Sequence, residues 1–310
     1  MQQSSSPVDG SPTSSPNGRR KVSHSKSKSL SCKAELMHAF NVQHPYGQNY
    51  PKGKAGEPHC WDEVDATLFS VRGKTYMTDR VKVPSPPAIL KLLDADYFLS
   101  KERLDQWALR EESLVQQLKK KGDTRFKFVL VLQFPPHHMA CTWVLEDPDQ
   151  TIEDVDPIFA ALWKKFAEGN EEFQNNRLKL IPRVVEGGFL VKKTLRSKPT
   201  LLGNKLKCRY FNYDDNVFEI DCDVFSSEIS RTMINMIKRY TKELSFDVAL
   251  VIQGNEEDEL PERVFAGINF SKVNIDGARV VDGIESGLED KKSASGEEDK
   301  KEKKGGWRLW

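Results

Sequence analysis

Three acidic residues alternate along one predicted strand and are the clearest arrangement in this chain that could do chemistry. Glu219, Asp221 and Asp223 occupy every second position, so their carboxylates project from one side of a strand. Oxygens on one side of a strand could hold a hard cation or supply a general acid. A cation site needs several converging oxygens, and a second interpretation explains the same acids.

The second interpretation is a β-hairpin over residues 206–224. Its register would place Arg209 opposite Asp221 and Lys207 opposite Asp223, which gives one charge-paired face. The other face would hold three apolar pairs, which are Leu206 with Val224, Cys208 with Cys222, and Tyr210 with Ile220. We favour this pairing over a metal or catalytic site, and we expect no disulfide between the two cysteines in a reducing compartment.

Other catalytic patterns are absent from the sequence. It contains no CxxC, HExxH, GxSxG, GxxxxGK[ST] or GxGxxG motif. The adjacent pairs His59-Cys60 and His137-His138 point to opposite sides of an extended chain, so neither pair chelates a metal readily. Cys141 stays open as a nucleophile, although buried structural cysteine is the commoner case. We therefore predict no enzyme, no cofactor and no metal.

A strongly basic segment is the second chemical feature. Residues 177–209 contain ten basic residues and one acid, Glu186, in a chain whose net charge is only +1. Clustered lysine and arginine favour anionic lipid headgroups, but the acidic stretch 214–262 could neutralise them instead. We give neutralisation the greater weight. The candidate headgroup ligands are Arg177, Lys179, Arg183, Lys192, Lys193, Arg196 and Lys198.

Helix start and stop patterns predict three helices. The first follows Ser100 and ends at Gly122, with three lysines in its last turn. The second begins with Asp156 as N-cap and Pro157 at the first helical position. The third begins at Ser226 or Ser227. Strands are expected at residues 126–134, 141–146, 178–181, 189–193, 206–211, 217–224, 246–252 and 264–273.

The order of these elements indicates the fold class. Short turns join most of the strands, and only one or two connections pass through a helix, which favours a mainly antiparallel sheet. We predict a single α+β domain in which this sheet packs with about three helices. The residues expected to be buried together are Phe128, Leu130, Leu132, Trp143, Phe159, Trp163, Leu250 and Ile252.

Composition bounds the domain and its compartment. The chain has 310 residues, 30% of them charged, and no apolar run long enough to span a membrane. Five scattered cysteines and no visible secretory signal predict a cytoplasmic protein. The near-zero net charge argues against nucleic acid as a partner. Residues 1–58 read as a disordered Ser/Pro-rich tail and linker, 59–275 as the domain, and 276–310 as a disordered mixed-charge tail.

Several short strings, in the right order over roughly residues 59–273, resemble the C-terminal domain of the plant Enhanced Disease Resistance 2 proteins. Phe218 stands where that family usually has tyrosine. The matching strings are residues 69–73 with Tyr76 and 79–82, residues 179–182 with 186–187, residues 198–199 with 202–203, residues 218–221 with Asp223 and 226–227, and residues 259–262.

The resemblance implies a regulatory role rather than catalysis. In the larger plant proteins this domain follows a pleckstrin-homology domain and a START lipid-binding domain, and those proteins are associated with lipid binding and regulated cell death. Residues 1–58 are too short and too polar for either domain, and the family offers no catalytic residues to carry over. We therefore expect a non-enzymatic domain associated with a lipid or an anionic membrane surface, peripheral to the membrane.

The alternative is a protein-interaction module regulated through the N-terminal tail. Ser6, Ser11 and Ser15 each precede proline, and Ser23 follows a basic run. Each phosphate would add about −1.5 to −2 charges to a tail whose first 31 residues carry a net +4. In this alternative the partner is a protein rather than a lipid surface.

Overall fold

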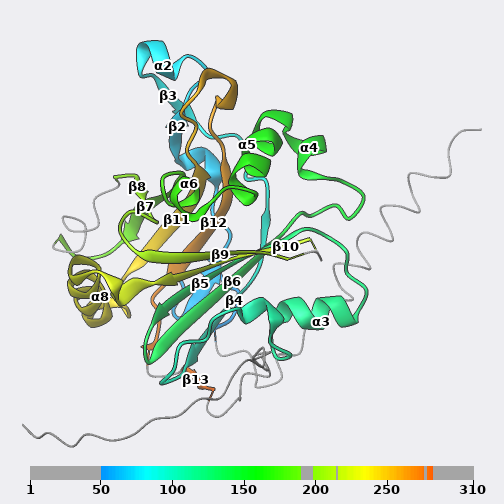
Figure 1. The fold of residues 1–310 in the computed structure, drawn as a ribbon. Coiled ribbons are helices and arrows are strands. Elements are labelled where there is room, and N and C mark those ends of the chain that lie inside the picture. Colours follow the sequence, from blue (N-terminus) through cyan, green and yellow to red (C-terminus); the bar gives the residue numbers. More distant parts are fainter. Residues whose placement is uncertain (1–49, 190–197, 214–215, 276–277, 282–310) are drawn as a thin grey trace, which may run out of the picture.

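Two β-sheets packed face to face form the body of the protein, which a computed structural model describes for residues 50–189, 198–213, 216–275 and 278–281 (Figure 1). The predicted α+β fold with a mainly antiparallel sheet is confirmed. The phosphorylation sites proposed for the N-terminal tail lie outside the described residues. No described helix is both long and apolar enough to cross a membrane.

The first sheet has five strands. All of its neighbouring strands run antiparallel. Its strands, in spatial order, are β1 (Cys60–Asp62), β12 (Val264–Ser271), β11 (Ser245–Ile252), β7 (Leu178–Glu186) and β8 (Thr200–Leu201).

The second sheet has six strands and two parallel pairs, β13 with β4 and β5 with β10. The parallel β5–β10 pair is possible because helices and the whole of β7 lie between these strands in the sequence. Its strands, in spatial order, are β13 (Arg279–Val280), β4 (Lys91–Leu99), β6 (His137–Val144), β5 (Lys127–Phe134), β10 (Val217–Asp223) and β9 (Lys207–Tyr213).

The main hydrophobic core fills the space between the two sheets. Phe128 and Trp143 enter it from one sheet and Leu250 from the other, while Phe159 and Trp163 enter it from helix α5 (Pro157–Ala167). The predicted core is therefore confirmed, with Leu132 only partly buried at its edge. The aromatic rings of Phe128, Phe159 and Phe265 pack against one another in the space between the sheets.

The helices begin where their caps predict, with one exception. Asp156 caps α5 and Ser227 caps α8, as expected from their side-chain oxygens. The helix predicted from Ser100 is wrong in its first half, because α3 begins only after Ser113. The helices are α2 (Tyr76–Asp79), α3 (Leu114–Lys120), α4 (Ile152–Val155), α5, α6 (Glu171–Asn175) and α8 (Glu228–Tyr240).

The hairpin register predicted for residues 206–224 is confirmed. Asp221 lies opposite Arg209, and Cys222 lies opposite Cys208. Strand β4 had no counterpart in the prediction, because Asp94 and Asp96 interrupt its apolar pattern although both are buried. Two strands outside both sheets, β2 (Ser70–Arg72) and β3 (Lys82–Pro84), form a separate ribbon that carries α2 at its tip (Figure 1).

Packed residues are found on both sides of the predicted domain boundaries. Tyr50 is fully buried in the main core, and its hydroxyl donates to the Cys60 carbonyl at 2.7 Å. At the other end Val281 is buried under the six-stranded sheet, next to β13. The strand predicted at residues 189–193 falls almost wholly outside the described residues.

Candidate functional site

The basic segment enters the fold along β7, where its first two members are buried. Arg177 Nη1 lies 2.5 Å from Glu259 Oε2, and Lys179 Nζ lies 2.5 Å from Glu262 Oε1. Further along the strand, Arg183 pairs with the buried Asp247. These three cations are therefore neutralised within the sheet by acids of the stretch 214–262, as the favoured interpretation predicted.

The remaining candidate headgroup ligands have a different place. Lys198 is exposed just before β8, whereas Lys192, Lys193 and Arg196 lie outside the described residues. The described candidates therefore do not form one exposed basic face, because Arg177 and Lys179 are buried. Headgroup binding by the rest of the segment stays a prediction.

Glu259 and Glu262 are the acids that hold the start of β7 in place. Glu262 is buried and accepts the Lys179 ammonium through both carboxylate oxygens, together with the Arg72 N–H at 3.0 Å. Burial alone would raise the pKa of Glu259, but hydrogen bonds from the Asn255 N–H and from Arg177 lower it. Burial lowers the pKa of Lys179 to about 8, against the opposing charge of Glu262.

The alternating acids of β10 lie on the outer face of the six-stranded sheet, beneath a cover formed by residues 100–113. We call this segment the strap. The strap packs Trp107 and Ala108 against Val129 and Val131 of β5. The alternating acids therefore face protein rather than solvent, and Glu219 and Asp221 are fully buried.

Backbone N–H groups of the strap donate to these acids. The Trp107 and Ala108 N–H groups donate to Glu219 at 2.6 and 2.9 Å, and the Gln106 N–H donates to Asp221 at 2.9 Å. These hydrogen bonds explain why the first half of the predicted helix does not form. Its backbone donors serve carboxylates of the sheet instead of carbonyls of a preceding turn.

The ion pairs predicted across the hairpin are wrong although the register is right. Asp223 pairs with Arg103 of the strap at 2.5 Å, and Arg209 pairs with Asp105 of the strap at 2.5 Å. Asp221 accepts a hydrogen bond from the backbone rather than from Arg209. The strap, which the sequence placed in a helix, thus supplies the partners that the hairpin was expected to supply itself.

Burial changes the acidity of the two carboxyls under the strap. It raises the pKa of Glu219 well above its usual value, and the neighbouring Asp221 raises it further. Burial likewise raises the pKa of Asp221 to about 6, against hydrogen bonds from Glu219 and the Gln106 N–H. The two groups therefore behave as one coupled acid pair that resists ionisation.

The strap interface contains buried polar atoms without a hydrogen-bond partner. Among the described residues, every buried side-chain nitrogen or oxygen without a hydrogen bond to the protein lies in this part of the fold. Each such atom costs stability, so the strap is a weakly optimised cover compared with the main core. The atoms belong to Arg103, Arg110, Glu112, Gln133, His138 and Asp221.

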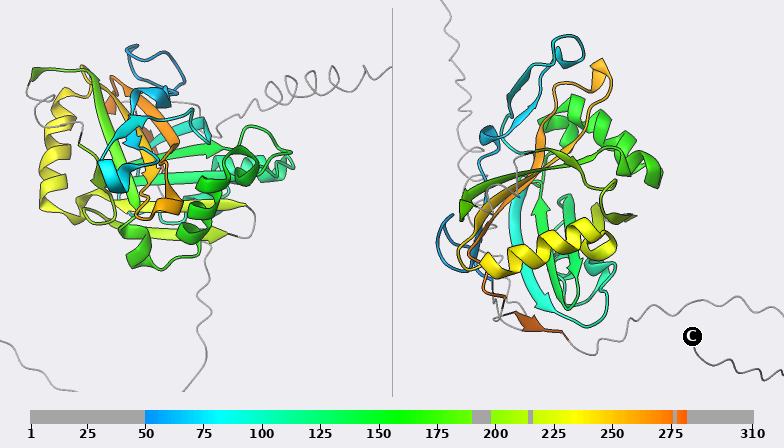
Figure 2. Two further views of the ribbon diagram at one scale, coloured as in Figure 1. Left: turned by 90° about the horizontal axis from the view of Figure 1, so that it is seen from above. Right: turned by 90° about the vertical axis from the view of Figure 1, so that its left-hand side faces the viewer.

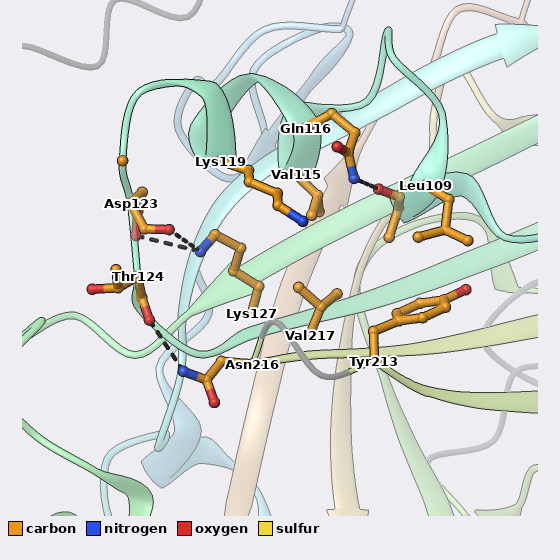
Figure 3. A pocket seen from close by; sticks show the side chains of 12 residues that line it. Leu109, Val115, Gln116, Lys119, Asp123, Thr124, Lys127, Tyr213, Asn216 and Val217 are labelled. Atoms are coloured by element: carbon orange, nitrogen blue, oxygen red, sulfur yellow. Dashed lines mark hydrogen bonds and ion pairs between the residues drawn. The ribbon is translucent and has the colours of Figure 1, made fainter.

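A surface pocket of about 260 Å³ opens at the end of the strap, between α3 and the ends of β9 and β10. Figure 3 shows the Lys119 ammonium and the Val115 side chain directed into it from α3, with Val217 and Tyr213 on the strands below. Lys127 also lines the pocket, but its ammonium donates to the carbonyls of the loop before β5. The lining is thus mixed, with apolar side chains such as Val115 and Val217 beside polar ones such as Gln116, Asp123 and Asn216.

Neither metal ligands nor an activated thiol come together in the part of the chain that the structure describes. Within the described residues, no three histidine, cysteine, aspartate or glutamate side chains come together as a metal site. The Cys141 thiol is fully buried, and burial raises its pKa well above the usual value, the opposite of what a nucleophilic thiolate needs. His138 contacts the Ser100 carbonyl of the strap.

Comparison with known proteins assigns the domain. The family model described as "Protein ENHANCED DISEASE RESISTANCE 2, C-terminal" matches residues 61–274. A curated protein of Arabidopsis thaliana named "Protein ENHANCED DISEASE RESISTANCE 2-like" is 30% identical over 224 residues, which cover 72% of this chain. The matched region spans only 30% of that relative, and no solved structure matches the chain. On this evidence the chain belongs to the ENHANCED DISEASE RESISTANCE 2 C-terminal family.

Proposed function

We propose that this domain is a non-enzymatic regulatory module that binds anionic membrane surfaces from the cytoplasmic side. The observation that carries the proposal is the position of Phe189, which is 79% exposed, more than any other large apolar side chain among the described residues. It lies three residues after the end of β7 and precedes Lys192, Lys193 and Arg196 in the sequence, which lie outside the described residues.

The sequence around Phe189 combines the two properties that peripheral membrane binding requires. Residues 187–198 contain four basic residues, no acid, and the apolar residues Phe189, Leu190, Val191 and Leu195. Exposed apolar side chains enter the interfacial layer of the bilayer, and basic side chains next to them attract anionic headgroups. Membership in a family named for disease resistance supports a regulatory role, and the fold supplies no assembled catalytic group among its described residues.

The test reverses charge within this segment. The triple variant Lys192→Glu, Lys193→Glu, Arg196→Glu should lose binding to phosphatidylserine-containing vesicles by roughly 100-fold, at about 1 kcal/mol for each basic residue near the surface. Sedimentation of protein with vesicles measures the bound fraction. Phe189→Ser should weaken binding without removing its dependence on salt, because it leaves the charges in place.

A matched control separates a local contact from net charge. The variant Lys101→Glu, Lys120→Glu, Lys121→Glu changes the charge equally at exposed positions elsewhere, and it should keep most of the binding. Equal loss in both triple variants would show that only the net charge matters and would remove residues 187–198 as the contact.

A further inference from the structure

The ribbon formed by β2 and β3 projects from one end of the five-stranded sheet. Figures 1 and 2 show α2 at its tip, beside the connection between β11 and β12. Arg72, at the end of β2 nearest the tip, ties the ribbon to this connection, since its guanidinium donates to the Gly254 carbonyl and its backbone N–H donates to Glu262. The ribbon is therefore a held projection, with its outer half away from the core.

Aliphatic side chains are exposed on this projection. Val81 is 49% exposed and Val83 is 36% exposed, and both lie on the same face of the ribbon. Val71, opposite Val83 on β2, is buried against the five-stranded sheet, so only the base of this face is covered. Leu68, just before β2, is 51% exposed, and such grouped apolar side chains indicate a contact surface.

Positive charge lies beside these aliphatic side chains. Lys74, Arg80 and Lys82 are exposed, and within the described residues none of them has an acidic partner at ion-pair distance. The Arg80 guanidinium lies over the Tyr76 ring, 5.5 Å from its centre, and Lys82 projects from the face of the ribbon opposite to Val81 and Val83. The one acid of the tip, Asp79, is already bonded to the Thr75 hydroxyl and the Val81 N–H. This arrangement is the reverse of β7, where the predicted headgroup ligands are neutralised by buried acids.

We propose that the β2–β3 ribbon is a second membrane contact, in which Val81 and Val83 enter the headgroup layer while Lys74, Arg80 and Lys82 bind anionic lipid. The inference rests on the proposed function and adds a second element to it. A bilayer fits better than an added peptide strand, because Pro84 in β3 has no N–H to donate to such a strand. The charge of the ribbon is complementary to an anionic surface.

Two ribbon variants and one control test this inference on the whole chain. The charge variant combines Lys74→Glu, Arg80→Glu and Lys82→Glu, and the valine variant combines Val81→Ser and Val83→Ser. Each of these two variants should lower binding to phosphatidylserine-containing vesicles by about tenfold or more. The Lys101→Glu, Lys120→Glu, Lys121→Glu control should bind nearly as the native chain does. The charge variant alters only exposed side chains, so it decides the matter if the valine variant folds poorly.

The possible failures are distinguishable. If both ribbon variants bind like the native chain while the variant at 192, 193 and 196 does not, the ribbon inference is wrong and the proposed function stands. If the native chain does not bind the vesicles, the proposed function fails and the ribbon inference fails with it. If the ribbon charges are needed for binding a polyglutamate peptide but not vesicles, the partner is an acidic protein and the membrane contact is refuted.

Discussion

Replacing Glu262 with alanine should lower the free energy of unfolding by about 3–5 kcal/mol, the usual cost of leaving one partner of a buried ion pair alone. The carboxylate is 1% exposed and accepts Lys179 through both oxygens. It also accepts the Arg72 N–H at 3.0 Å and the Gly254 N–H at 3.2 Å. Its removal leaves a buried ammonium and two backbone donors without their acceptor. Equilibrium unfolding in urea at neutral pH measures the loss.

A rescue variant shows whether the buried charge is the cause. Glu262→Leu combined with Lys179→Met removes both charges and keeps much of the volume, so it should recover a large part of the loss. The surface pair of Lys91 and Glu146 at 3.0 Å is the matched control, and Glu146→Ala should cost no more than about 1 kcal/mol. A loss below about 1 kcal/mol for Glu262→Ala would contradict the role given to this pair.

Replacing Asp221 with asparagine should remove a pH dependence from the stability of the domain. In the folded chain the pKa of Asp221 is about 6, because burial disfavours its charged form, whereas the ordinary value is 3.8. Between these values the folded state holds more protons than the unfolded state, so stability falls as pH rises. Relative to the native chain, Asp221→Asn should therefore gain up to about 3 kcal/mol between pH 4 and pH 7.

The comparison between the two chains isolates the titration of Asp221 together with its effect on Glu219, whose pKa Asp221 raises. Asp105, Asp123 and Glu259 have lowered pKa values, so they lose stability as pH falls, the opposite direction. Their contributions cancel because both chains contain them. Asp149→Asn, at an exposed position, serves as the control and should show no comparable gain. A constant difference between Asp221→Asn and the native chain from pH 4 to pH 7 would refute the assignment.

The sequence predicts those features of the fold that depend on residues close together in the chain, which are the register of the β9–β10 hairpin and the helix caps. From Phe218 to Asp223 of β10, apolar and acidic residues alternate, and from Lys207 to Tyr210 of β9, basic and apolar residues alternate. One register therefore places the apolar side chains of both stretches on the same face. The observed pairing of Asp221 with Arg209 confirms that register. The caps of α5 and α8 are equally local, because one side-chain oxygen and its nearest N–H groups define each of them.

The partners of the charged residues could be predicted only in part. The charge of residues 177–209 suggested an anion site, but Glu259 and Glu262 lie more than eighty residues further along the chain. Their proximity depends on the pairing of β7 with β11, which brings the following loop back to the start of β7. The preference for neutralisation was correct for Arg177, Lys179 and Arg183, although the sequence could not pair the individual residues.

The strap could not be predicted from its own residues. Leu104, Trp107 and Ala108 have a spacing that suits a helix. This spacing does not show whether a side chain elsewhere in the fold will accept the backbone N–H groups that a helix would need. In the fold the N–H groups of this stretch bind Glu219 and Asp221 of a strand about 110 residues away. The strap buries Glu219 and Asp221, and these two acids accept the N–H groups that hold the strap in its conformation. Neither feature is therefore recognisable from one stretch of sequence.

Vesicle composition provides the most direct test of the central claim, which is that this domain binds anionic membrane surfaces. The native chain should sediment with phosphatidylcholine vesicles only when they contain phosphatidylserine, and the bound fraction should rise with phosphatidylserine content. Added salt should weaken the binding, because the Debye length falls to about 3 Å at 1 M ionic strength. Equal sedimentation with neutral and anionic vesicles, or none with either, would contradict the claim.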